Sequence, residues 1–221
     1  MTEPDVTLTD FGLALECALF IVLLQRGPAG KGSLRSWYTL FFTSMGAASL
    51  LGGTVHGFFL DETRPGAVLL WQLTLLAMGV TTLSLWAIGG TLLFSQRVFR
   101  WVLAAAALQL VAYGVIVLFV TQEFWVGVAD SLPAVLFLLV ALLVLYARQR
   151  RGILLLAAVG PALTLVASLL QYLRIGVHPH YFNHNAFFHV LQAIALLLFF
   201  LGGRWLIGKD RGGDDELLGA S

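Results

Sequence analysis

Hydrophobic residues run in long stretches along this chain, and short polar breaks separate them. A helix that crosses the hydrocarbon core of a bilayer needs about 20 mostly apolar residues. Seven stretches meet or approach that length, at about 8–26, 37–60, 66–94, 101–120, 126–147, 152–173 and 185–207. The breaks between them are too short to hold a soluble domain. The pattern therefore predicts an all-α, seven-helix transmembrane domain over residues 1–208 and a disordered tail at 209–221.

The composition agrees with a membrane protein. The chain is 59% hydrophobic and 11% charged, whereas a soluble domain carries about 25% charged residues. The net charge of +1 gives no indication of a nucleic-acid partner, and no protein partner is predicted. We expect membrane lipid to be both the environment and a candidate substrate. The acidic start MTEPDVTLTD lacks the basic region of a secretory signal.

The basic residues predict the orientation of the helices. Eleven of the thirteen lie in the first, third and fifth breaks or near the C-terminus, and only Arg64 and Arg174 lie on the opposite side. Because basic residues gather on the cytoplasmic side, we expect the N-terminus outside and the C-terminus in the cytoplasm. The chain is thus expected to be a multi-pass protein of a cellular membrane, such as the bacterial inner membrane.

The candidate chemistry gathers in the outer half of this arrangement. All five histidines belong to that half, and two of them, His56 and His189, lie inside their spans. Each is four residues from the outer end of its helix, or roughly 6 Å below the boundary. Asp130 reaches a similar level in the fifth span, and Glu16 lies deeper in the first. An ionisable group inside a span costs about 2.5–3.5 kcal/mol on insertion scales, which makes each a functional candidate.

Structural roles remain open for the same residues. A histidine near a helix end often bonds to a backbone carbonyl or to interfacial water. Asp130 fits a capping position before Pro133, and Glu16 fits a pairing with an interhelical polar group such as Gln72. The combination of two histidines at matched depth with an acid nearby nevertheless favours one shared site.

Two segments carry a family resemblance. A histidine late in the second span (GGTVHGFF), with an aromatic-flanked histidine that opens the last span (FNHNAFFHVLQAIALLLFF), resembles the CREST superfamily. This group includes the alkaline ceramidases and the adiponectin and progestin receptors. The resemblance implies seven helices and a zinc ion bound by one histidine of the second helix and two of the seventh, with water as fourth ligand. It carries over to His56 and His189 as zinc ligands.

The chain departs from that family pattern at three places. The histidine expected four residues before His189 is Asn185, although His184 lies one position earlier. The serine expected one turn before His56 is Gly52, and Ser49 lies about two turns back. The third span, residues 66–94, holds no carboxylate, so Asp130 is the candidate substitute for the acid that the family carries there.

These observations define a predicted site. We expect His56, His184 and His189 to bind zinc, and Asp130 and Ser49 to serve in catalysis, while Glu16, Asn185 and Gln192 support the ligands. Zinc with one open position lowers the pKa of its bound water to about 7 and polarises a carbonyl group. The predicted function is hydrolysis of a lipid amide or ester at the outer leaflet.

Two other functions stay open. His56 and His189 are also suited to supply both axial ligands of a haem. Alternatively, the protein is a non-catalytic sensor or receptor, in which Glu16, Asp130 and the histidines bind a ligand or relay protons. Transport is disfavoured because the inner half lacks acids and histidines within the spans. A retinal protein is excluded, since the only lysines, Lys31 and Lys209, lie outside the spans.

Overall fold

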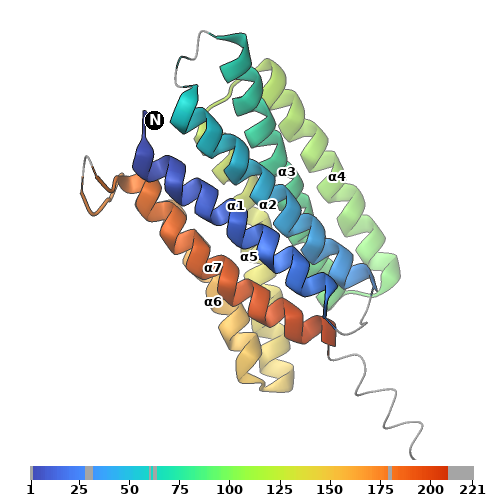
Figure 1. Cartoon of the computed structure of the whole chain (residues 1–221). Helices are drawn as coiled ribbons and strands as arrows, with labels where there is room; N and C mark the ends of the chain where they lie inside the picture. Colours follow the sequence, from blue (N-terminus) through green and yellow to red (C-terminus); the bar gives the residue numbers. More distant parts are fainter. Residues whose placement is uncertain (1, 28–31, 60, 62–63, 179–180, 209–221) are drawn as a thin grey trace, which may run out of the picture.

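The computed structural model describes residues 2–27, 32–59, 61, 64–178 and 181–208 and contains seven α-helices in that part of the chain (Figure 1). They are α1 (Pro4–Gln25), α2 (Gly32–Phe58), α3 (Pro65–Leu93), α4 (Gln96–Phe119), α5 (Phe124–Gln149), α6 (Gly152–Tyr172) and α7 (His184–Gly208). Every predicted span falls on one helix, so the all-α, seven-helix prediction is confirmed. The predicted tail at 209–221 lies outside the described residues.

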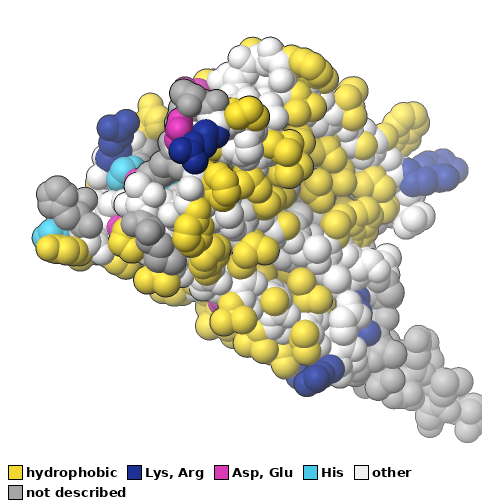
Figure 2. Space-filling view, turned by 45° about the horizontal axis from the view of Figure 1, so that its top comes forward, with side chains coloured by type: hydrophobic (Ala, Val, Ile, Leu, Met, Phe, Trp, Pro, Cys, Tyr) yellow, Lys and Arg dark blue, Asp and Glu magenta, His cyan; other side chains and the backbone are white. Residues whose placement is uncertain are grey.

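Six of these helices are long and apolar enough to cross a membrane. Helices suit this environment because each one satisfies its own backbone hydrogen bonds in the absence of water. Figure 2 shows hydrophobic side chains gathered in broad areas over the visible flank of the bundle. The remaining helix, α2, is richer in serine, threonine and glycine, and it packs between α1 and α3. The chain is therefore a multi-pass membrane protein whose second helix is its most polar.

The helices form a ring with one member outside it. Each ring helix packs against the next in the order α1, α2, α3, α5, α6 and α7, and α7 packs against α1 to close the ring. Helix α4 packs against α3 on the outside of this ring (Figure 1). We call the end of the ring at which α1 begins the outer end, after the orientation that the basic residues predict.

Aromatic side chains fill the inner half of the ring. The rings of Phe20 and Phe200 stack with centroids 4.3 Å apart, and Phe42 meets Phe20 edge-on at 5.3 Å. Phe41 and Phe199 meet at 5.0 Å in the same cluster. Such contacts add to the large apolar area that each aromatic ring buries. This cluster ties α1, α2 and α7 together and closes the inner half of the ring.

Glycines on α2 let α1 approach closely. A Cβ atom built at Gly53 would lie 2.9 Å from Cβ of Asp10, and one built at Gly57 would lie 2.9 Å from Cγ2 of Thr7. Small residues at helix interfaces in membranes permit this kind of backbone contact. The approach places Asp10 of α1, which is 5% exposed, inside the protein.

We expect Gly53→Ala to lower stability by about 1–3 kcal/mol, because the added methyl group would overlap both Asp10 and the Phe11 ring. Gly52→Ala is the matched control, since a Cβ atom there lies at ordinary contact distance, 3.5 Å from Oδ2 of Asp10. The two variants are compared by thermal unfolding in detergent. Equal midpoints for both would contradict the close approach at Gly53.

Candidate functional site

A central cavity of about 290 Å³ lies within the ring and extends inward from its outer end. All six ring helices contribute to its wall, and none of the described residues of α4 does. Along α7 the lining runs from Asn185 to Phe199, which is about 21 Å at 1.5 Å per residue. The volume lies near the lower end of the roughly 300–1,000 Å³ range of small-molecule sites.

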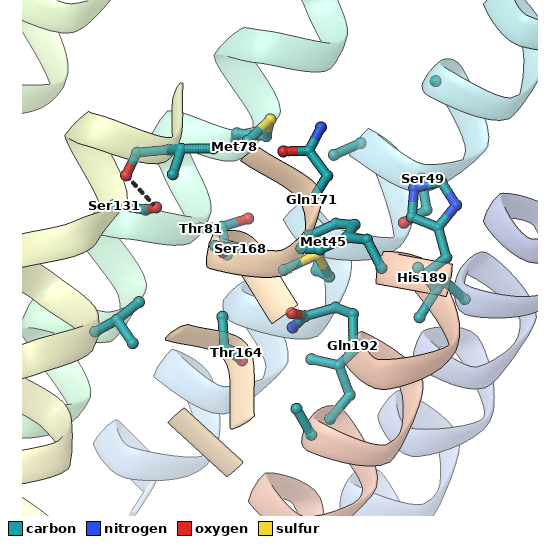
Figure 3. A pocket seen from close by; sticks show the side chains of 18 of the residues that line it. Met45, Ser49, Met78, Thr81, Ser131, Thr164, Ser168, Gln171, His189 and Gln192 are labelled. Atoms are coloured by element: carbon teal, nitrogen blue, oxygen red, sulfur yellow. Dashed lines mark hydrogen bonds between the residues drawn. The ribbon is translucent and has the colours of Figure 1, made fainter. Parts of the chain in front are cut away.

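The wall of the cavity carries its ionisable groups in the outer part, beside the aromatic rings of Trp71, Phe124 and Phe188, and is apolar at the deep end. Its outer part carries ionisable and amide side chains, namely Asp10, His56, Gln171, Asn185 and His189. Further in lie hydroxyls and one more amide, and Figure 3 shows several of them around the cavity: Thr81, Ser131, Thr164, Ser168 and Gln192. The deep end is made of Phe41, Leu85, Leu138, Leu196 and Phe199. The cavity thus matches an elongated molecule with a polar head and an apolar tail.

Helix α1 holds His189 from two sides. Nδ1 of His189 lies 3.0 Å from Oγ1 of Thr9. The Thr9 hydroxyl is placed to donate to the carbonyl oxygens of Asp5 and Val6. Since that bond uses the hydroxyl proton, we assign Nδ1 as the donor and Oγ1 as the acceptor. Nε2 of the neutral ring then carries a lone pair, and it faces Oδ1 of Asp10 at 3.4 Å.

Two acceptor atoms that face each other in a buried place are unfavourable unless a positive charge lies between them. The side chains of Asp10 and His189 are only 7% and 13% exposed. A proton shared by the pair satisfies this condition, and so does a metal ion. The pair is therefore a point in the cavity wall that requires a proton or a metal ion between its two atoms.

His56 has a carboxylate partner of its own. Its Nδ1 atom lies 2.6 Å from Oε2 of Glu3, and the backbone N–H of Glu3 donates to the carbonyl oxygen of His56. Where Nδ1 donates to this carboxylate, Nε2 is left as an acceptor. Carboxylates that bind one ring nitrogen commonly orient histidines whose other nitrogen binds a metal. His56 and His189 line one cavity, and each has an acid beside it.

Neither acid is among the site residues predicted from the sequence: Glu3 precedes the predicted first span at 8–26, and Asp10 lies in the first turn of that span. Helix α1 begins at Pro4, a residue suited to the first helical position. Its buried face includes Val6, Asp10, Leu13 and Cys17. This spacing of three and four residues is visible in the sequence and would have identified Asp10 as a polar residue on a buried stripe.

Three of the other predicted site residues line the cavity. They are Ser49, Asn185 and Gln192. The amide of Gln171 donates to Oδ1 of Asn185 at 3.2 Å, so Asn185 has a partner on α6. Gln192 is 4% exposed, and its Oε1 atom has no hydrogen-bond partner among the described residues.

His184 and Glu16 are not part of the lining. Asn183 caps α7, because its Oδ1 accepts from the backbone N–H groups of Asn185 and Ala186. His184 is therefore the first helical residue and not part of a non-helical approach, so it lies about 140° around the helix from His189. Oε2 of Glu16 is buried without a hydrogen-bond partner among the described residues, so that oxygen makes no such pairing with Gln72.

Asp130 faces a different part of the protein from the one we predicted. Its side chain and its carbonyl oxygen both accept hydrogen bonds of 2.8 Å from Nε2 of Gln109 on α4. Oε1 of Gln109 accepts in turn from Nε1 of Trp86 on α3. The capping alternative is wrong, since α5 begins at Phe124 and Asp130 lies within it. Asp130 is absent from the cavity lining and instead ties the outlying helix α4 to α5.

No group of three or more His, Cys, Asp or Glu side chains in the described part of the chain is arranged to hold a metal ion. The pair of Asp10 and His189 supplies two candidate ligand atoms. His56 is the further histidine in the same wall.

Comparison with known proteins identifies a family. The sequence model of a family of unknown function (DUF6962) matches residues 6–207, and the chain belongs to this family. No curated protein and no solved structure matches the chain.

The hydrogen-bond network around Asp130 yields a prediction. Gln109→Leu removes the amide that donates to Asp130 and leaves the half-buried Asp130 carboxylate without this hydrogen bond. We therefore expect the free energy of unfolding to fall by about 1–3 kcal/mol. Asp130→Asn keeps an acceptor for Gln109 and should cost less. Both are measured by thermal unfolding in detergent, with ligand or metal binding to the cavity expected to be unchanged in Asp130→Asn. Loss of ligand or metal binding in Asp130→Asn would show that Asp130 takes part in the candidate site after all.

Proposed function

We propose that this member of the DUF6962 family is a metal-dependent membrane hydrolase that acts on a lipid amide or ester in its central cavity. The observation that carries the proposal is the pair of Asp10 and His189, whose Oδ1 and Nε2 atoms face each other at 3.4 Å. Two ligands of a tetrahedral zinc ion, each about 2.0–2.1 Å from the metal, are about 3.4 Å apart. The pair therefore fits two neighbouring positions around such an ion.

The chain's own residues have distinct roles in this proposal. Asp10 and His189 would hold the ion, and His56 of α2 is the candidate third ligand. Thr9 fixes the ring of His189 through Nδ1, and Glu3 does the same for His56. A zinc ion with an open position would supply a bound water of lowered pKa and polarise the scissile carbonyl. The predicted serine, Ser49, lies deeper in the same wall.

The shape of the cavity supports a lipid as substrate. Its ionisable residues lie at the outer end, and its apolar residues continue inward to Phe41 and Phe199. A lipid oriented as in the bilayer would place its polar linkage beside His189 and its chain against the deep wall. A lipid that binds without being cleaved would instead support the receptor alternative.

The haem alternative is less favoured by the same geometry. A bis-histidine haem needs one free nitrogen from each imidazole pointing at the iron. Nε2 of His189 faces a carboxylate oxygen at 3.4 Å, and its other nitrogen faces Thr9. Neither nitrogen is open to an iron centre without displacing one of these partners.

We expect purified protein to contain about one zinc ion per chain, as in other single-metal hydrolase sites, and His189→Ala and Asp10→Ala to lose it. His184→Ala is the matched control and should keep the metal, since His184 lies outside the cavity lining. The measurement is elemental analysis with a visible spectrum. Zinc retained in His189→Ala would refute the proposed metal site. A haem absorption band in the visible spectrum would instead support the haem alternative.

The carboxylate partner of His56 gives a separate prediction. Glu3→Gln weakens the orientation of the ring, so we expect metal affinity or lipid hydrolysis to fall by about 10–100-fold. Asp61→Asn is the control, because Asp61 is a half-exposed acid paired with Arg64. Fatty acid released from amide and ester lipids is followed by mass spectrometry. An equal effect of both variants would argue against a role for Glu3.

A further inference from the structure

We infer that Gln192 is a specificity-determining residue that selects lipids bearing a hydrogen-bond donor, a hydroxyl or an amide N–H, next to the polar linkage. The inference rests on the proposed function in one respect, namely that the cavity takes an elongated lipid. It adds a chemical requirement to that lipid. The requirement comes from a single side chain that the proposed metal chemistry does not use.

The first observation is an unpartnered acceptor. Gln192 is 4% exposed, and its Oε1 atom is buried with no hydrogen-bond partner among the described residues. A buried polar atom left unpaired costs about 1–3 kcal/mol, so such atoms are rare unless something else satisfies them. By contrast, Gln171 and Asn185 in the same cavity satisfy each other.

The second observation is the position of this acceptor. Gln192 lines the cavity and lies three residues after His189 on α7, which is one turn, or about 4.5 Å, further inward. Figure 3 shows its amide directed toward the middle of the cavity, on the side of Thr164. A lipid whose linkage lies at His189 would therefore place the first atoms beyond that linkage beside Oε1.

These two observations together define a selective contact. Water can satisfy Oε1 while the cavity is empty. A lipid with a donor at this level replaces the water and restores the hydrogen bond. A lipid without one expels the water and leaves Oε1 unpaired, and sites of this kind discriminate strongly against the analogue that lacks the donor.

The test uses two pairs of probes in which the second member lacks the donor: N-ethyldecanamide against ethyl decanoate, and decanol against decyl methyl ether. Binding of each probe to the full chain in lipid nanodiscs is measured from the rise in Tm with probe concentration. A chelator is present throughout, so that neither metal nor hydrolysis contributes. The result is therefore independent of whether the protein is an enzyme.

For wild-type protein we expect the donor-bearing member of at least one pair to bind about tenfold more tightly, the ratio that one buried hydrogen bond accounts for. Gln192→Met keeps the side-chain length but removes the acceptor, and it should reduce the ratio to about one. Gln171→Met is the matched control, because its amide already donates to Asn185, and it should keep the ratio. The pair that responds distinguishes an amide from a hydroxyl donor.

A stability measurement keeps the inference falsifiable if probe binding is weak. Gln192→Met removes an acceptor that has no partner among the described residues of the protein, so the Tm of the empty protein should stay the same or rise. A lowered Tm would show that Oε1 is satisfied within the protein, and it would overturn the inference. An unchanged ratio in Gln192→Met, no preference in wild-type protein, or no binding of any probe would overturn it as well.

Discussion

The close approach of α1 to α2 is the packing constraint on which the candidate site depends. Gly53 and Gly57 have no side chain to separate the two backbones, so α1 lies near enough to α2 for Asp10 to be buried. The same approach brings Glu3 to the last turn of α2, where it meets His56. A bulkier residue at Gly53 would move α1 outward and take both carboxylates with it.

The ring and the aromatic cluster then decide where polar groups can lie. In the inner half, Phe20, Phe42 and Phe200 fill the space between helices. In the outer half, the aromatic rings of Trp71, Phe124 and Phe188 contact one another along the wall of a cavity and leave its centre open. Ionisable groups within a membrane are tolerated mainly where they meet partners or line a cavity. The concentration of histidines, acids and amides at one end follows from this division.

Polar residues outside the ring have a structural role. The one extensive packing contact of helix α4 in the described part of the chain is with α3. Much of the remaining surface of α4 faces lipid, where hydrophobic association is weak. Gln109 compensates by bonding both to Asp130 on α5 and to Trp86 on α3. Interhelical hydrogen bonds of this kind are one of the few specific forces between helices in a bilayer. Asp130 is an in-span acid whose contacts are with this network and not with the cavity.

The sequence by itself determined the class of the protein and its seven helices, and it indicated His56 and His189 as candidates, because apolar length and residue type are local properties. It also indicated Asn185 from its position four residues before His189. Only the tertiary structure decided which acid accompanies which histidine. Asp130 and Asp10 are both acids near the outer end of a helix, and the rotation of each helix in the ring turns one toward Gln109 and the other toward His189. That rotation is set by packing between helices, for which a single sequence carries only a faint periodic signal.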